Sequence, residues 1–108
     1  MDYKVIIQRV NALLDLEVPI TEPDLETALK DLEMARKPLL EARVQAQIDL
    51  AKKRSQYLHP KDRDLTELDR KIMLDANTTT ELEYFELLYG LEGLLKDRHA
   101  TLSLLLDI

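Results

Sequence analysis

Residues 24–57, DLETALKDLEMARKPLLEARVQAQIDLAKKRSQY, carry the longest amphipathic pattern in the chain. Leucine and alanine recur here at spacings of three and four residues, at positions Leu25, Ala28, Leu32, Ala35, Leu39, Ala42 and Ala46. Side chains at this heptad spacing lie along one side of an α-helix, so another helix has to cover them. The small alanines let the backbone of that covering helix come close. The stretch therefore predicts the long helix of a hairpin or bundle.

Two local features of this stretch need interpretation. Pro38 removes one backbone hydrogen bond, but the heptad spacing continues through it, so we predict a kink near Pro38 and no helix end. Residues 42–50 alternate apolar and polar residues, which is also a strand pattern. We reject the strand because these residue types favour helix and no second alternating segment exists to pair with it.

On a helix the apolar residues of this stretch form two adjacent rows. The rows are Leu39–Ala42–Ala46–Leu50 and Leu40–Val44–Ile48–Ala51. An apolar face that spans two rows is wider than one partner helix covers. The long helix is therefore predicted to have two neighbours.

Two further helical segments flank the long helix. Residues 2–16 repeat apolar side chains at i, i+3, i+4 and i+7, which predicts a short helix that is marginal alone and has to dock. Pro19 and Pro23 separate it from the long helix. After a turn at residues 58–61, residues 64–107 form the predicted return arm. This arm contains a second heptad pattern, at Tyr84, Leu88, Leu91, Leu95, Arg98, Leu102 and Leu105.

The return arm also contains residues that oppose a straight helix. Three threonines in succession follow Asn77, and Thr78 with Glu81 resembles a capping box. We therefore predict a break near Asn77. Gly90 and Gly93 each cost about 1 kcal/mol relative to alanine inside a helix, for which close packing of another backbone is the expected reason.

The composition is that of one ordinary folded domain. Of 108 residues, 45% are apolar and 33% are charged, with only two glycines and four prolines. We expect a single all-α domain over residues 1–108, an elongated antiparallel helical hairpin or bundle of three to four helices. The net charge of −6 argues against nucleic acid as a general partner. Without cysteine, a signal-peptide core or a membrane-length apolar run, a cytoplasmic protein without membrane contact is expected.

No motif in the sequence predicts catalysis. Gly90 and Gly93 form no phosphate-binding loop, and His59 and His99 have no metal-binding spacing. The acidic residues do not suggest an active site, because five of them precede a lysine by four positions, as is typical of exposed helix faces. These pairs are Glu26–Lys30, Glu33–Lys37, Asp49–Lys53, Glu67–Lys71 and Glu92–Lys96. We expect no enzymatic activity, no metal and no cofactor.

A short basic cluster lies at the predicted hairpin tip, residues 52–63. Its cations are Lys52, Lys53, Arg54, Lys61 and Arg63, opposed by Asp62 alone. One interpretation is a docking site for phosphate groups, nucleic acid or an acidic protein surface. The simpler interpretation is that cations favour the C-terminus of a helix, where they complement its dipole.

The relative lengths of the two long segments predict self-association. Paired from a turn at Pro60, the return arm extends about 10 residues past the start of the long helix at 1.5 Å per residue. The overshooting residues 99–108 are rich in leucine, and such a surface is rarely left in water. We therefore expect a homodimer with its two-fold axis through the C-terminal helices. The candidate interface residues are Leu88, Leu91, Leu95, Leu102, Leu105 and Ile108.

The leading functional hypothesis is a non-enzymatic interaction or scaffold protein that acts as a homo-oligomer. The alternative is a small regulatory protein that binds an anionic partner through the basic tip. In a third interpretation, the apolar stripe of the last helix forms a groove for a partner helix.

Overall fold

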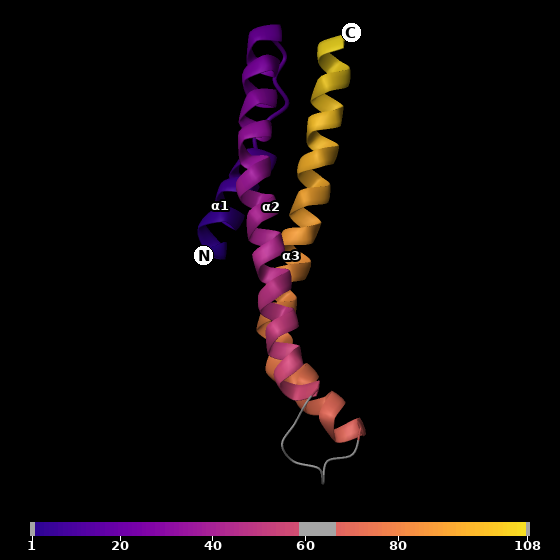
Figure 1. Cartoon of the computed structure of the whole chain (residues 1–108). Coiled ribbons are helices and arrows are strands. Elements are labelled where there is room, and N and C mark those ends of the chain that lie inside the picture. The colour runs from indigo at the N-terminus through magenta and orange to yellow at the C-terminus, as the bar shows by residue number, and fades with distance from the viewer. Residues whose placement is uncertain (1, 59–66, 108) are drawn as a thin grey trace.

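The computed structural model describes residues 2–58 and 67–107, and its three elements are all α-helices. Helix α1 spans Tyr3–Leu14, α2 spans Glu22–Leu58 and α3 spans Glu67–Asp107. Helices α2 and α3 form an antiparallel hairpin about 65 Å long, and α1 packs against both of them (Figure 1). The predicted all-α hairpin or bundle is confirmed, with three helices in the described residues.

Helix α2 follows its predicted heptad pattern. Leu25, Leu32, Leu39, Ala42 and Ala46 are all buried between the helices. The helix passes through Pro38 without a break, as predicted, and residues 42–50 are helical and not a strand. Pro38 is exposed, so its missing N–H donor is not needed in the core. The first apolar row of α2 thus contributes Leu39, Ala42 and Ala46 to the core.

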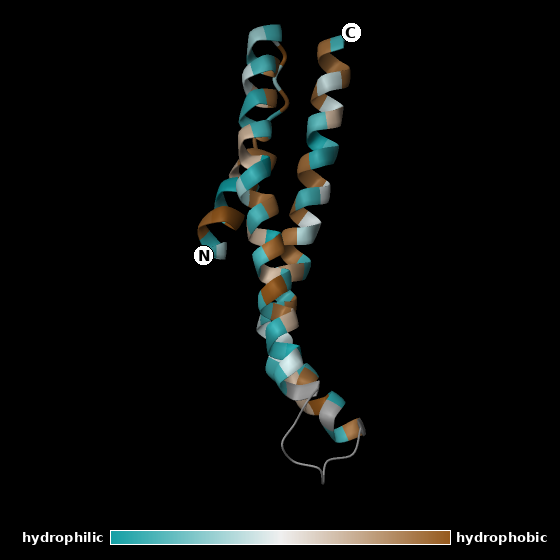
Figure 2. Ribbon diagram, in the orientation of Figure 1, coloured by the Kyte–Doolittle hydropathy of each residue, from teal (hydrophilic) through white to brown (hydrophobic). Residues whose placement is uncertain are grey.

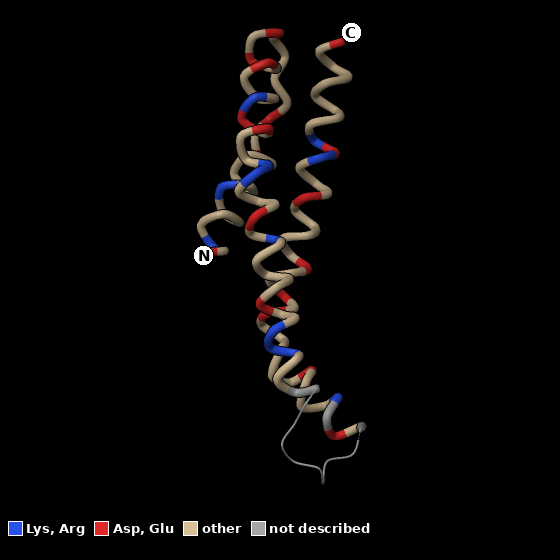
Figure 3. The backbone as a smooth tube through the Cα atoms, viewed as in Figure 1, with Lys and Arg blue, Asp and Glu red and all other residues tan. Residues whose placement is uncertain are grey.

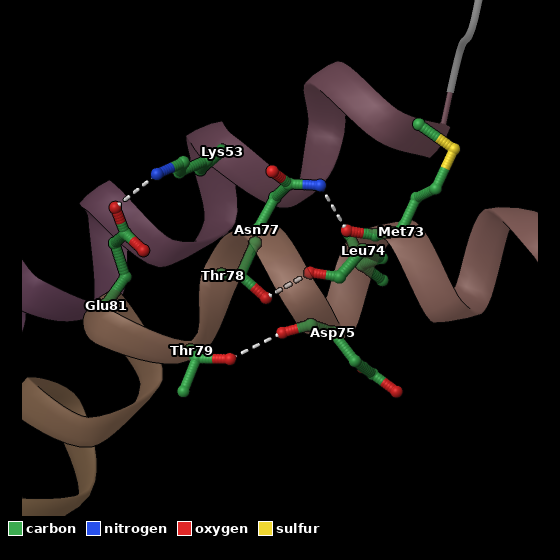
Figure 4. Close-up of polar contacts among 8 residues, drawn as sticks. All are labelled: Lys53, Met73, Leu74, Asp75, Asn77, Thr78, Thr79 and Glu81. Carbon is green, nitrogen blue, oxygen red and sulfur yellow. Dashed lines mark hydrogen bonds and ion pairs between the residues drawn. The ribbon is translucent and has the colours of Figure 1, made fainter.

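The predicted break near Asn77 is wrong, because α3 is continuous from Glu67 to Asp107. The polar side chains at this point bond to carbonyl oxygens four residues earlier, over 2.6–2.7 Å (Figure 4): Asn77 to Met73, Thr78 to Leu74 and Thr79 to Asp75. Each side chain therefore satisfies its hydrogen bond within the helix and does not cap a new one. This arrangement lets Thr78 be buried without an unpaired hydroxyl.

The predicted overshoot of the return arm is also wrong. Three interhelical contacts set the register of α2 against α3: Glu33 with His99, Arg43 with Glu92, and Lys53 with Glu81. In each contact the midpoint between the two residue numbers is close to 67. The turn was predicted about seven residues earlier, at Pro60. The C-terminal end of α3 consequently lies level with the start of α2 (Figure 1).

The last turns of α3 are thus part of the hairpin itself. They carry no Lys, Arg, Asp or Glu between Arg98 and Asp107 (Figure 3). Leu102 is buried and Leu106 packs on the core, while Leu104 and Leu105 are exposed. The apolar side chains expected to need a second copy are therefore partly buried within the chain and partly exposed at separate positions.

Helix α1 docks along both long helices. Asp2 caps its N-terminus, and Val10 is its one buried residue. The Tyr3 hydroxyl donates to Asp49 Oδ2 over 2.6 Å, and its ring lies 5.3 Å from that of Tyr84. At the other end of α1, the Arg98 guanidinium donates to the backbone carbonyl of Leu16. Arg98, the single charge in the second heptad pattern, therefore fastens the segment after α1 to α3.

The Tyr3–Asp49 contact predicts a pH-dependent contribution to stability. Burial, followed by the hydrogen bond and the charge of Asp49, raises the pKa of Tyr3 from 10.0 to about 12. Hydrogen bonds from Tyr3 and Gln45 lower the pKa of Asp49 below 3.8. The contribution is therefore fully present between these ordinary pKa values. It is lost as pH rises from 10 towards 12, and also as pH falls below 3.8.

We expect Tyr3→Phe to lower the free energy of unfolding by about 1 kcal/mol near neutral pH, the usual size of such a hydrogen bond. Urea unfolding of both proteins across pH gives the measurement. The difference between them should shrink at both extremes of pH. A difference that stays constant through pH 3 to pH 11 would mean that the hydroxyl does not contact an ionised Asp49.

Candidate interaction groove

Helix α1 covers only one side of the α2–α3 hairpin. On the other side lies a groove of about 800 Å³. Leu32, Leu39 and Leu95 contribute to its apolar lining, together with Leu40 and Tyr89. A cavity of this size between two helices is a common site for binding.

Helix periodicity explains why this side is open. Leu40 is nine residues, or about two and a half turns, from Asp31 and from Asp49, which lie on the α1 side. It therefore points away from α1. On α3, Tyr89 is nine residues from Arg98, whose side chain reaches the end of α1. Both groove residues thus lie on the face of their helix opposite α1.

The uncovered side continues along α2 beyond the groove. Leu40, Val44 and Ile48 lie one turn apart, and 40–44% of each remains exposed. Figure 2 shows hydrophobic residues interspersed with hydrophilic ones along both long helices. We call the groove and this row together the groove face. The row is the second of the two apolar rows of α2, and no helix of the described chain covers it.

Charged side chains line the groove and tie its walls together. Arg43 Nε donates to Glu92 Oε1 over 2.9 Å, and His99 lies 3.2 Å from Glu33. Two further cations line the groove, Arg36 and Lys96, and neither has an ion-pair partner among the described residues. The groove therefore has surplus positive charge in a protein of net charge −6.

The expected pairing within single helices is mostly replaced by pairing between helices. Glu92 was expected to pair with Lys96 but contacts Arg43 of α2, and Glu33 contacts His99 of α3. Asp49 accepts from Tyr3 and from Gln45. An acidic residue four positions before a lysine can instead pair with a better-placed donor on another helix. The spacing within one helix therefore did not identify these partners.

Four of the leucines predicted to form an oligomer interface lie in the core of the single chain. Leu88, Leu91, Leu95 and Leu102 are each less than 5% exposed. Their partner is the first heptad row of the same chain. Leu105 is 39% exposed, and Ile108 lies outside the described residues.

The structure describes only part of the predicted basic tip. Lys52 is exposed, while Lys53 donates to Glu81 Oε1 over 2.7 Å (Figure 4) and thereby lowers the pKa of Glu81. Arg54 is half-buried. Lys61 and Arg63 lie outside the described residues, so an anionic partner at residues 52–63 stays a prediction.

Over residues 2–58 and 67–107 the structure contains no cluster of three or more acidic or histidine side chains suited to a metal ion. None of the described helices has an apolar stretch long enough to cross a membrane. No protein-family model matches the chain, and no curated protein or solved structure matches it significantly.

Proposed function

We propose that this protein is a non-enzymatic helical interaction protein that acts as a homo-oligomer through its groove face. The observation that carries this proposal is the second apolar row of α2. Leu40, Val44 and Ile48 have the spacing of residues that pack against a helix, yet their side chains remain exposed. Helix α2 has both α3 and α1 as neighbours, and neither of them covers this row.

A second copy of the chain suits this face for two reasons. The α2–α3 hairpin with α1 on one side is a bundle that lacks a helix on the other, and a second hairpin supplies that layer. The hairpin is also long enough, since a stable interface buries roughly 800 Å² on each partner. The apolar row meets the groove at Leu40 and continues from there along α2, in a molecule 65 Å long.

The groove chemistry supports binding and not catalysis. The Arg43 guanidinium is held by Glu92 and by Gln47, and the His99 ring contacts Glu33. These groups connect α2 to α3 across the groove. An apolar groove with a charged rim is the usual anatomy of a protein interface.

The test is the molar mass in solution, measured by light scattering over a range of concentrations. An elongated molecule elutes early from a sizing column, so the scattering mass has to decide. We expect a mass twice that of the 12.5 kDa chain. Leu40→Glu should raise the dimer dissociation constant at least tenfold, because it places a carboxylate in the apolar row of the interface.

Met34→Glu is the matched control, because Met34 is an exposed apolar residue of the same helix. It lies six residues before Leu40, so its side chain points about 120° around the helix axis from that of Leu40. This variant should leave the mass unchanged, and circular dichroism should show equal helicity for both variants. A wild-type mass of 12.5 kDa at every concentration up to about 1 mM would overturn the proposal.

A further inference from the structure

Four residues of α3 form a row with an internal symmetry. Glu86, Tyr89, Gly93 and Lys96 follow one another at spacings of three, four and three, so they lie along one side of the helix. The last three line the groove, and Glu86 continues the same row. The row is symmetric about position 91: Glu86 and Lys96 are equally far from it, and so are Tyr89 and Gly93.

We propose that the second copy binds antiparallel, with the two-fold axis crossing α3 at the level of Leu91. This inference rests on the proposed self-association and specifies its geometry. The symmetry then places Tyr89 of each copy against Gly93 of the other. It also places Lys96 of each copy beside Glu86 of the other. One contact thus matches a large side chain to a small one, and the other matches opposite charges.

The shape of the row supports this pairing. A side chain built at Gly93 would meet no atom within 4 Å, so nothing in the chain requires glycine there. The expected reason for this glycine, close packing of another backbone, is wrong within the single chain, and the same holds for Gly90. Tyr89 is 62% exposed, and its ring is steadied by Phe85 at a centroid distance of 6.0 Å. An exposed aromatic ring and a bare stretch of backbone one turn away are complementary in size.

The charges select the antiparallel direction. Glu86 and Lys96 are exposed, and neither has an ion-pair partner among the described residues. An antiparallel two-fold pairs each with its opposite. A parallel arrangement in register would set Glu86 against Glu86 and Lys96 against Lys96, which is unfavourable.

The α2 row extends the same interface. Arg43 contacts Glu92, so Leu40 and Val44 lie at the level of residues 90–95 of α3, close to the proposed axis. Antiparallel hairpins that meet along α3 bring these side chains to the flanks of the α3–α3 contact. The α2 row therefore supplies the apolar area that a stable dimer needs. The α3 row determines the antiparallel direction and the register of the two copies.

The charge part is tested by exchanging the two residues. Lys96→Glu and Glu86→Lys should each weaken the dimer at least tenfold, since each places like charges together at two symmetric positions. The double variant Lys96→Glu with Glu86→Lys restores opposite charges and should return the dissociation constant to within about threefold of wild type. Sedimentation equilibrium measures all four proteins at one salt concentration.

The shape part is tested at the two glycines. Gly93→Leu should abolish the dimer, because the new side chain occupies the space taken by Tyr89 of the other copy. Gly90→Leu meets equally open space one turn from Glu86 and from Gly93, beside the proposed Tyr89 contact and not in it, so it should weaken the dimer much less than Gly93→Leu. Both should keep or raise the monomer's melting temperature, because glycine is unfavourable inside a helix. A dimeric Gly93→Leu protein would overturn the proposed axis.

The outcomes separate this geometry from the proposed function. If wild type is monomeric throughout, self-association itself is wrong. If wild type is dimeric and Leu40→Glu dissociates it, but the charge exchange restores nothing, the groove face is the interface and the antiparallel axis is wrong. Recovery in the double variant together with a monomeric Gly93→Leu would establish the geometry.

Discussion

Replacing Leu88 by alanine is expected to lower the free energy of unfolding by about 2–5 kcal/mol, a large part of the total for a domain of this size. Leu88 is fully buried between α2 and α3. Truncation removes its apolar contacts and leaves a cavity that two long helices cannot readily close. Urea unfolding followed by circular dichroism gives the difference.

The neighbouring Leu87 supplies the control for this variant. It has the same side chain on the same helix, but 46% of it is exposed, so Leu87→Ala should cost less than about 1 kcal/mol. The loss at Leu88 should also be the same at low and high protein concentration, because its contacts lie within one chain. A loss that appears only where the protein is dimeric would instead place Leu88 at an interface between copies.

Replacing Val10 by aspartate is expected to release α1 from the hairpin. Val10 is 1% exposed and is the only buried residue of α1, and an unpaired carboxylate at this site costs several kcal/mol. Once undocked, a helix of 12 residues is marginal in water and should unfold. Amide hydrogen exchange should then show residues 3–14 unprotected while the central turns of α2 and α3 remain protected.

Asn11→Asp is the matched control, because it introduces the same carboxylate one residue later at an exposed position. Its exchange pattern should match that of wild type. Continued protection of residues 3–14 in Val10→Asp would show that Tyr3 and Arg98 hold α1 in place without the buried valine.

The helices and the core of the hairpin were predictable because they depend on local periodicity. Two heptad patterns, one from Leu25 and one from Tyr84, lie in one chain, and each buries the other. Once both patterns are known, a hairpin satisfies both without a second molecule. The leucines of the second pattern, Leu88, Leu91, Leu95 and Leu102, are therefore covered within one chain and do not need a partner to bury them.

The break near Asn77 was mispredicted because one side chain has two local options. Asn and Thr can cap a new helix or can bond to the carbonyl four residues earlier within an existing one. The sequence permits both at Thr78. The burial of Thr78 against α2 selects the second, since a cap would interrupt the backbone where the two helices pack.

Sequence alone determined the helical class, the three helical segments and the core rows of this protein, because these follow from the spacing of apolar residues along each helix. It also determined that α2 has two apolar rows. The tertiary structure decided the register of α2 against α3, the interhelical ion pairs and the side taken by α1. These features depend on which side chains far apart in the sequence come into contact. Helical periodicity determines which face of a helix a side chain lies on, but not which distant side chain it contacts. Because α1 docks beside Asp49 and Tyr84, Leu40 and Tyr89 remain on an open face.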